Sequence, residues 1–316
     1  MASESTRVIY AAIAANLAIA VTKFTAAAFT NSSAMISEGI HSLVDTGNGG
    51  LMLLGVRRSA KPADAKHPFG YGKELYFWTL IVAIVIFAVG GGISAYEGLL
   101  HLLHPAPLSN PTWNYGVLAF AFVFESYSFA VAFRAFEREK GPQSFWQSIH
   151  RSKDPTTYTV LFEDAAALLG LIVAFAGVFM AHSLNNPYFD GAASIVIGLI
   201  LAVVAVVLAY ESKGLLVGEA ADPETLKDIR RLAEADPYVE GVNRALTTHF
   251  GPETILLAMD LQFKKTLSAA EVEQSVDRLE EEIRKRHPDV KHIFIESDSL
   301  PPLKQPRKES PIKTSP

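Results

Sequence analysis

The sequence predicts an α-helical membrane protein: a six-span transmembrane bundle followed by a cytosolic α+β domain with the order αββαβ. Six stretches before residue 218 are long and apolar enough to cross a bilayer, which takes about 20 mostly apolar residues. After Glu219 the pattern changes to amphipathic helices and alternating strands, as in a soluble domain. We therefore expect a six-helix transmembrane domain at 1–218, a cytosolic domain at 219–299 and a disordered, proline-rich tail at 300–316.

Composition excludes several classes of protein. Of the 316 residues, 49% are hydrophobic and 19% charged, which excludes global disorder because so apolar a chain seeks burial. The chain has no cysteine, and this excludes a disulfide scaffold and a zinc finger. Its formal net charge of −5 argues against nucleic acid as a partner, because proteins that bind this polyanion are usually basic.

Basic residues set the expected orientation in the lipid bilayer. The expected spans are Val8–Thr30, Ser33–Val56, Leu75–Leu103, Tyr115–Phe136, Tyr158–His182 and Phe189–Leu216. Lys and Arg gather in the joints at 57–73 and 134–153, and the other joints hold none. Because basic loops face the cytoplasm, we expect these joints and both termini there. No cleavable signal is expected before the first span, and the expected host is the plasma membrane or a bacterial inner membrane.

A polar stripe runs along the second span. Glu38, His41, Asp45 and Asn48 recur every three or four residues, so they share one face of a helix. A charge in mid-bilayer is costly, and such residues usually face the bundle interior or a water-filled path. The stripe therefore predicts a functional site inside the bundle.

The fifth span adds two carboxylates, Glu163 and Asp164. Two helices that present imidazole and carboxylates to each other can form a tetrahedral site for a divalent first-row cation such as Zn²⁺. The alternative is that these groups only hydrogen-bond the helices together. Lys23 in the first span either pairs with an acidic residue of the second span or snorkels to the interface.

Three further polar residues lie near the outer end of the third span. Glu97, His101 and His104 are expected at the membrane interface, with no assigned role.

The soluble half follows a clear order of elements. A helix is expected at 223–236 with Asp222 as its cap, and a second at 269–287 with a capping box of Ser268 and Glu271. Strands are expected at 242–250, 254–263 and 290–298. This order predicts a small sandwich with both helices on one face of the sheet.

The last strand carries a row of polar side chains. Strand periodicity places His292, Phe294, Glu296 and Asp298 on one side, where Asp260 and His249 of the other strands could join them. A metal site and a solvated edge both fit this row, and the solvated edge is favoured.

Three stretches carry a resemblance to a known family: SSAMISEGIHSLVDTGN at 32–48, KPADAKHPFGYGK at 61–73 and FEDAAALLG at 162–170. Together with the six spans and the cytosolic αββαβ domain, they resemble the cation diffusion facilitator family. The residues of the motifs are most similar to those of its zinc-transporter-nine branch. The resemblance implies a homodimeric exporter that exchanges Zn²⁺ or a similar cation for H⁺. It also implies a ferredoxin-like C-terminal domain that dimerises. No prosthetic group is implied, and the cation is cargo.

The resemblance also implies ligands, residue by residue. His41 and Asp45 match the metal ligands of the family's second span, and Asp164 matches the Asp of a fifth-span His-x-x-x-Asp pair. The His of that pair falls on Val160, so one expected ligand is missing. Glu163, Asn48 or a water molecule could complete the coordination shell of the metal ion.

The family's other metal positions are incomplete in this chain. Asp64 and His67 match loop ligands, but Tyr71 stands where a further His is expected, so a simple turn is favoured. Glu296 and Asp298 stand at the family's ligand-bearing strand end in place of His.

These observations lead to a hypothesis of alternating access around one intramembrane site. His41, Asp45 and Asp164 would bind the cation after losing protons, and His41 is the natural proton carrier. Fewer nitrogen ligands favour harder ions, so exporters of Mn²⁺, Co²⁺ or Fe²⁺ are alternatives. A channel and a non-transporting scaffold also stay open, whereas no signature of an enzyme is found.

Overall fold

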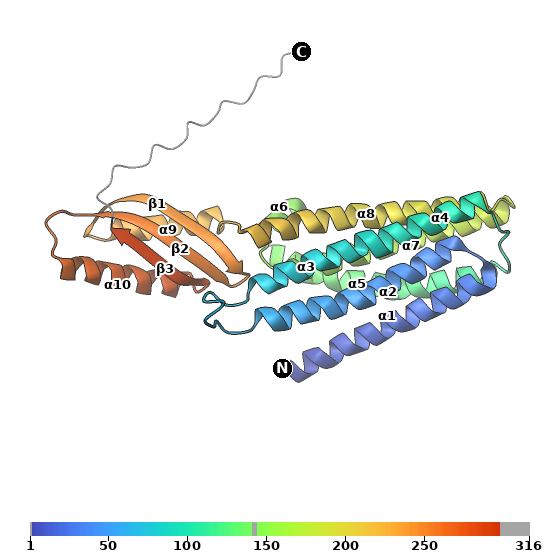
Figure 1. The fold of residues 1–316 in the computed structure, drawn as a ribbon, viewed down its shortest axis with the longest axis horizontal. Coiled ribbons are helices and arrows are strands. Elements are labelled where there is room, and N and C mark those ends of the chain that lie inside the picture. The colour runs from blue at the N-terminus through green and yellow to red at the C-terminus, as the bar shows by residue number, and fades with distance from the viewer. Residues whose placement is uncertain (1, 141–143, 298–316) are drawn as a thin grey trace, which may run out of the picture. The chain divides into compact units, whose positions relative to one another are not determined.

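The structure is a computed structural model that describes residues 2–140 and 144–297 (Figure 1). The chain divides into two compact units, and the main division falls between Glu219 and Ala220. The tail expected at 300–316 lies outside the described residues.

The first unit is a bundle of helices. They are α1 (Ala2–Thr30), α2 (Ser33–Ser59), α3 (Lys73–Val85), α4 (Gly92–Leu103), α5 (Thr112–Lys140), α6 (Phe145–Arg151), α7 (Pro155–Ser183) and α8 (Tyr188–Val217). A π-helical segment, η1 (Ile86–Gly91), joins α3 to α4 without a break. Local signals explain several starts: Ser32 caps α2 through Met35 N–H, and Asp154 caps α7, which has Pro155 at its first position.

Four stretches of the described chain are long and apolar enough to cross a membrane. They are Lys73–Leu103, Thr112–Arg138, Pro155–Ser183 and Tyr188–Val217. These four stretches make the first unit a membrane-type helical domain. The helix α2 is not among them, because its polar stripe lowers its mean hydropathy. The expectation of six spans is thus supported for these four stretches, which include the expected third to sixth spans.

The helix α8 has one apolar face buried in the bundle and another apolar face exposed on its outside. Its buried face carries Ile197, Leu201, Ala205 and Leu208, and its exposed face carries Leu199, Val203, Val206 and Tyr210. A helix that is apolar all round belongs in an apolar surrounding on every side. The exposed face is therefore suited to lipid.

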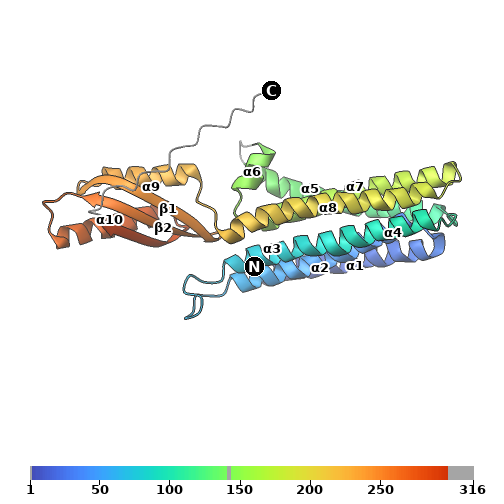
Figure 2. The same ribbon diagram turned by 45° about the horizontal axis from the view of Figure 1, so that its top comes forward.

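Glycines bring the end of η1 and the helix α4 into close backbone contact with α8, beside which α4 runs in Figure 2. A Cβ on Gly98 would stand 2.7 Å from the carbonyl oxygen of Gly191, and one on Gly198 would stand 2.8 Å from that of Gly91. The two pairs are seven residues apart on both helices, so they lie two turns along one seam. Small residues at such positions let membrane helices approach closely.

A buried ion pair joins α1 to α2. Lys23 Nζ lies 2.9 Å from Glu38 Oε2 and donates to Ser42 Oγ, also at 2.9 Å. Both charged side chains are fully buried. Of the two alternatives for Lys23, pairing with an acidic residue of the second span is confirmed.

The second unit is a three-stranded sheet with two helices. Its elements are α9 (Pro223–Ala235), β1 (Val239–Gly251), β2 (Thr254–Phe263), α10 (Ala269–Arg286) and β3 (Val290–Ser297). The strand order is β1-β2-β3, with β2 and β3 parallel. The expected order αββαβ is observed, as are the Asp222 cap and the capping box of Ser268 with Glu271.

One face of this sheet forms the core of the second unit. Alternate residues of β2 are buried, namely Ile255, Leu257, Met259, Leu261 and Phe263. They pack in one cluster with Ile229 and Ala233 of α9 and with Leu279 and Ile283 of α10. This period of two is the pattern of a sheet covered on one side.

The glycine seam gives a first prediction. Gly98→Ala should lower the free energy of unfolding by about 1–3 kcal/mol, because the new methyl group overlaps the Gly191 carbonyl and Ile195. Thermal unfolding of the purified protein in detergent measures this. Gly116→Ala on α5 is the control, since a Cβ there meets nothing within 4 Å. Equal melting temperatures for the two variants would contradict the close packing.

The buried ion pair gives a second prediction. Lys23→Met should destabilise the protein by about 3–5 kcal/mol, because it leaves Glu38 buried without its counter-charge. The double variant Lys23→Met, Glu38→Gln should recover most of that loss. The same unfolding measurement checks both, and a double variant no more stable than the single one would exclude a coupled pair.

Candidate metal site between the helices α2 and α7

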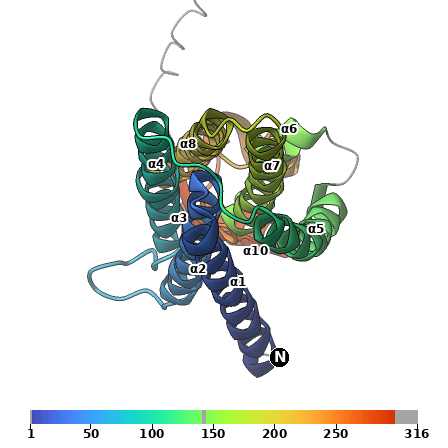
Figure 3. The ribbon, with the colours of Figure 1, turned by 90° about the vertical axis from the view of Figure 1, so that its right-hand side faces the viewer.

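The polar stripe of α2 lies inside the bundle. Figure 3 looks along the bundle and shows α2 among α1, α4, α7 and α8, all of which it contacts. His41 is 2% exposed, Asn48 is fully buried, and the side chain of Asp45 is 12% exposed. The helical period thus turns these groups toward protein, as the stripe predicts.

Two hydrogen bonds tie the acidic pair of α7 to other helices. Asn48 Nδ2 donates to Glu163 Oε1 at 2.8 Å, and Ser128 Oγ of α5 donates to Asp164 Oδ2 at 2.8 Å. Glu163 therefore faces α2 although it lies about 100° round the helix from Asp164. Both carboxylates of the pair are held in fixed directions.

These side chains border a cavity of about 340 Å³. Its polar lining comes from α1, α2, α5 and α7: Asn16, Asp45, Thr46, Ser128, Thr156, Glu163 and Asp164. Val160 lines the same cavity, at the position where the family resemblance places a histidine. The structure thus brings Asp45, Glu163 and Asp164 together, while His41 lies beside them, one turn from Asp45.

Several buried polar atoms at this place have no hydrogen-bond partner among the described residues. They are both ring nitrogens of His41, Asp45 Oδ1 and Asn48 Oδ1. His41 Nδ1 and Asp45 Oδ1 are 3.5 Å apart, too far for a good hydrogen bond. Leaving such groups unpaired costs about 1–3 kcal/mol each, a cost that a bound cation would remove.

The donors are not gathered around one point. Within 2–140 and 144–297, no three His, Cys, Asp or Glu side chains are placed to hold one metal ion together. Side-chain rotation toward the cavity is therefore part of any binding event at this site.

The loop residues form a turn. Asp64 accepts hydrogen bonds from the backbone N–H groups of Lys66 and His67 and from the Tyr71 hydroxyl, at 2.6–2.8 Å. The bond from Tyr71 is the largest of the effects that lower the pKa of Asp64 to about 2. The carboxylate of Asp64 is thus occupied by its own loop.

On the sheet of the second unit, the parallel register sets Asp260 opposite Glu296. Asp260 also accepts a hydrogen bond from Asn243 at 3.3 Å. Asp298 lies outside the described residues, and His249 is buried. A metal site at this edge stays a prediction.

Nothing in the sequence indicated the role of Ser128 of α5, which lines the cavity and donates to Asp164. Asn16 of α1 lines the cavity as well, whereas the sequence showed only that it shares a helix face with Lys23. A single serine or asparagine in an apolar helix gives no directional signal, because only the neighbouring helix defines its role.

Both units of the chain match family models of cation efflux proteins. Residues 9–217 match the family model of the cation efflux transmembrane domain, and residues 221–299 match that of the cation efflux protein cytoplasmic domain.

Curated relatives cover most of the chain. The mouse proton-coupled zinc antiporter SLC30A9, mitochondrial, is 32% identical over 92% of this chain and 58% of its own length. Metal tolerance protein C4 of Arabidopsis thaliana is 29% identical over 82% of this chain and 57% of its own length. The cation-efflux pump FieF of Shewanella oneidensis is 26% identical over 84% of this chain and 85% of its own length.

The chain thus spans a little more than half the length of the mouse and plant relatives. Its apolar helices make it an integral membrane protein, and its two matched regions place a transmembrane domain before a cytoplasmic one. The protein belongs to the cation efflux family of transporters.

Proposed function

We propose that this protein exports a divalent cation, Zn²⁺ in the first place, in exchange for H⁺. The cation binds between α2 and α7, with His41, Asp45 and Asp164 as ligands and Glu163 as the fourth. One observation carries this proposal: the unpaired carboxylate oxygen of Asp45 on α2 shares a cavity with Glu163 and Asp164 of α7, in a chain of the cation efflux family. The unpaired imidazole of His41 lies beside that cavity, 3.5 Å from Asp45.

Proton exchange follows from the ligands themselves. Carboxylates and imidazole bind a metal only after losing their protons, so cation binding releases H⁺. When the site opens to the other side of the membrane, protons compete for the same atoms and displace the cation. His41 is the proposed proton carrier among the ligands, because an unperturbed imidazole changes charge closer to neutral pH than a carboxylate does.

A harder ion such as Mn²⁺ is the second candidate cargo. Asp45, Glu163 and Asp164 bring carboxylate oxygens to the cavity, whereas Val160 replaces the second imidazole. Oxygen-rich sites suit Mn²⁺ better than sites with two histidines.

The rest of the architecture is proposed with the function. All six long helical stretches cross the membrane, with both termini in the cytoplasm, and the transport domain at 1–218 precedes a ferredoxin-like domain at 219–299. That domain pairs with its copy in a homodimer, which is supported by the dimer-type family model at 221–299. The proposed host is the plasma or bacterial inner membrane, although the curated name of the mouse relative places that protein in mitochondria.

A third prediction tests the site. In proteoliposomes, metal-driven proton movement should be lost in the Asp45→Ala, Asp164→Ala double variant, because two of the three proposed carboxylate ligands are gone. Proton movement and uptake of Zn²⁺ and Mn²⁺ are measured together. Asp64→Ala is the matched control, since its carboxylate serves the loop, and it should transport like the wild type. Retained transport by the double variant would refute the site.

A fourth prediction concerns the choice of cation. Val160→His puts an imidazole into the cavity and should raise the preference for Zn²⁺ over Mn²⁺ by about tenfold, the effect of one added nitrogen ligand worth about 1.4 kcal/mol. Competition uptake with the two ions measures this ratio. Val160→Leu keeps an apolar side chain and should leave the ratio unchanged. An unchanged ratio in Val160→His would show that this position does not face the bound ion.

A further inference from the structure

The helix α5 carries a buried carboxyl group, Glu125, that does not line the cavity at the proposed metal site. Its side chain belongs to a residue that is only 7% exposed. Other buried residues of the same helix face recur at spacings of three and four, namely Asn114, Leu118 and Ala121. The opposite face carries exposed apolar side chains such as Tyr127, which suit lipid. Glu125 therefore faces the bundle, in the middle of a stretch long and apolar enough to cross a membrane.

Glu125 has no polar partner in the part of the chain that the structure describes. Within 2–140 and 144–297 its carboxyl group makes no hydrogen bond and no ion pair. Buried polar groups are normally bonded, and charged groups at membrane depth are normally paired. An ionised carboxylate without a partner in an apolar surrounding is costly, so the neutral, protonated group is the form that suits this place.

Two contacts define how α5 packs against α1. Thr30 Oγ1 donates to Asn114 Oδ1 at 2.8 Å, and Asn16 and Ser128 line one cavity together. The two contacts lie 14 residues apart on both helices, and the order of residues is reversed. The helices α1 and α5 are therefore antiparallel and keep one register between these contacts.

This register places Glu125 between the proposed metal site and the buried ion pair. Glu125 comes three residues before Ser128, which donates to Asp164 at the cavity. In the other direction, Lys23 of α1 is level with Ala121, one helical turn away from Glu125. Glu125 is thus within electrostatic reach of both places, although it contacts neither through a hydrogen bond.

The charges that act on Glu125 are mostly negative. They come from Lys23 of α1, from Glu38 and Asp45 of α2, and from Asp164 of α7. Lys23 is the cation among these four, and its ammonium group already lies 2.9 Å from Glu38. No positive charge of this set is left over for Glu125, which again favours a proton on its carboxyl group.

We propose that Glu125 is a proton-binding site, which releases its proton when a divalent cation occupies the site between α2 and α7. The cation brings two positive charges to Asp45 and Asp164, and a nearby positive charge favours the ionised form of a carboxyl group. H⁺ leaves a carboxyl oxygen of Glu125, and no bond to the metal forms there. When the cation departs, the same oxygen binds a proton again.

Such a proton carrier deepens the proposed function, on which it rests, because it adds an exchanged proton that no metal ligand supplies. A ligand loses its proton because the cation takes its lone pair, whereas Glu125 loses its proton through charge alone. The effect is mutual: a proton on Glu125 weakens cation binding by the same factor by which the cation weakens proton binding. Protons at the side of release would thus help to expel the cation.

The experiment counts the protons released when Zn²⁺ binds to the purified full chain in detergent. Released H⁺ is measured with an indicator dye in weakly buffered solution, and bound Zn²⁺ by equilibrium dialysis. Glu125→Gln resembles the protonated carboxyl group and should release about one proton fewer per bound ion, because a carboxamide has no proton to give up. The visible absorption of bound Co²⁺ should stay as in the wild type, because Glu125 is not a ligand.

Two further substitutions at this position sharpen the test. Glu125→Met is a second neutral variant of similar length, and it should lose the same proton even where the amide of Glu125→Gln disturbs folding. Glu125→Asp keeps a carboxyl group and should release as many protons as the wild type.

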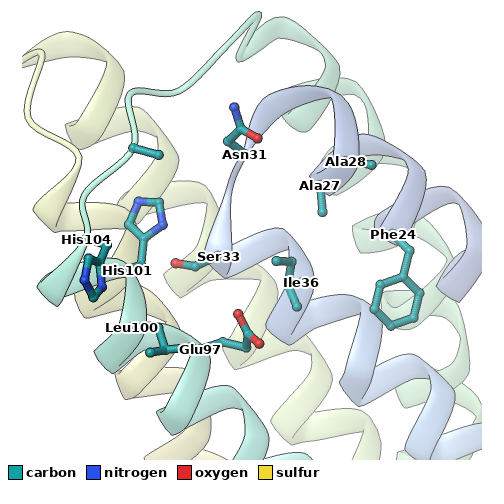
Figure 4. Close-up of a pocket in the computed structure, with 11 residues that line it drawn as sticks. Phe24, Ala27, Ala28, Asn31, Ser33, Ile36, Glu97, Leu100, His101 and His104 are labelled. Atoms are coloured by element: carbon teal, nitrogen blue, oxygen red, sulfur yellow. The ribbon is translucent and has the colours of Figure 1, made fainter.

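The matched control is Glu97→Gln, which removes a carboxyl group elsewhere in the bundle. Glu97 of α4 lines a second cavity, of about 640 Å³, where α1 turns into α2 (Figure 4). Ser33 and His101 line it as well, and it shares no lining residue with the cavity at Asp45 and Asp164. Glu97→Gln should therefore release as many protons per Zn²⁺ as the wild type.

Unchanged proton release in Glu125→Gln and Glu125→Met overturns the inference, as does an equal loss in Glu97→Gln. An altered Co²⁺ spectrum in Glu125→Gln also overturns it, because Glu125 would then be a ligand. These outcomes leave the proposed function standing, since the wild type still binds the cation and releases protons. A wild type that binds neither Zn²⁺ nor Mn²⁺ would instead refute the proposed function, and the inference with it.

Discussion

The buried ion pair of Lys23 and Glu38 is the interaction on which the membrane unit depends. Taking two charges out of water costs several kcal/mol per ion, so the pair is stable only in close contact. Ser42 satisfies a further Lys23 proton, and Gly170 of α7 leaves the space that a Glu38 oxygen fills. The helices α1, α2 and α7 are thus packed around one pair of charges. This packing also fixes the rotation of α2 about its axis, and with it the direction of every polar group on that helix.

The first turn of α2, just before Glu38, is held by a different charge. Asp190 of α8 accepts from the first backbone N–H groups of α2, where the helix dipole favours a negative group. The glycine seam in turn holds α8 against α4, so the position of α4 follows from that of α8. As a result, α2 borders both cavities: Ser33 lines one, and Asp45 lines the other.

The composition of the proposed site between α2 and α7 suits a transporter that has to release its cation. Its donors are unpaired or held by single hydrogen bonds, and they stand around a cavity without closing on one point. A structural zinc site is closed and holds its metal tightly, whereas a transport site must both bind and release its cation. An open set of carboxylates with one imidazole suits that need, because such groups bind a metal only after losing their protons.

The sequence by itself determined the elements. The helical period put Glu38, His41, Asp45 and Asn48 on one face, and local caps such as Ser268 with Glu271 set helix starts. These features follow from interactions between residues close in the chain. Only the tertiary structure decided which groups meet. It pairs Lys23 with Glu38 and Asn48 with Glu163. It also shows a cavity beside His101, a residue that the sequence placed at the membrane interface. The period of a helix says which side chains share a face, but the helix that this face meets is decided by packing between segments far apart in sequence.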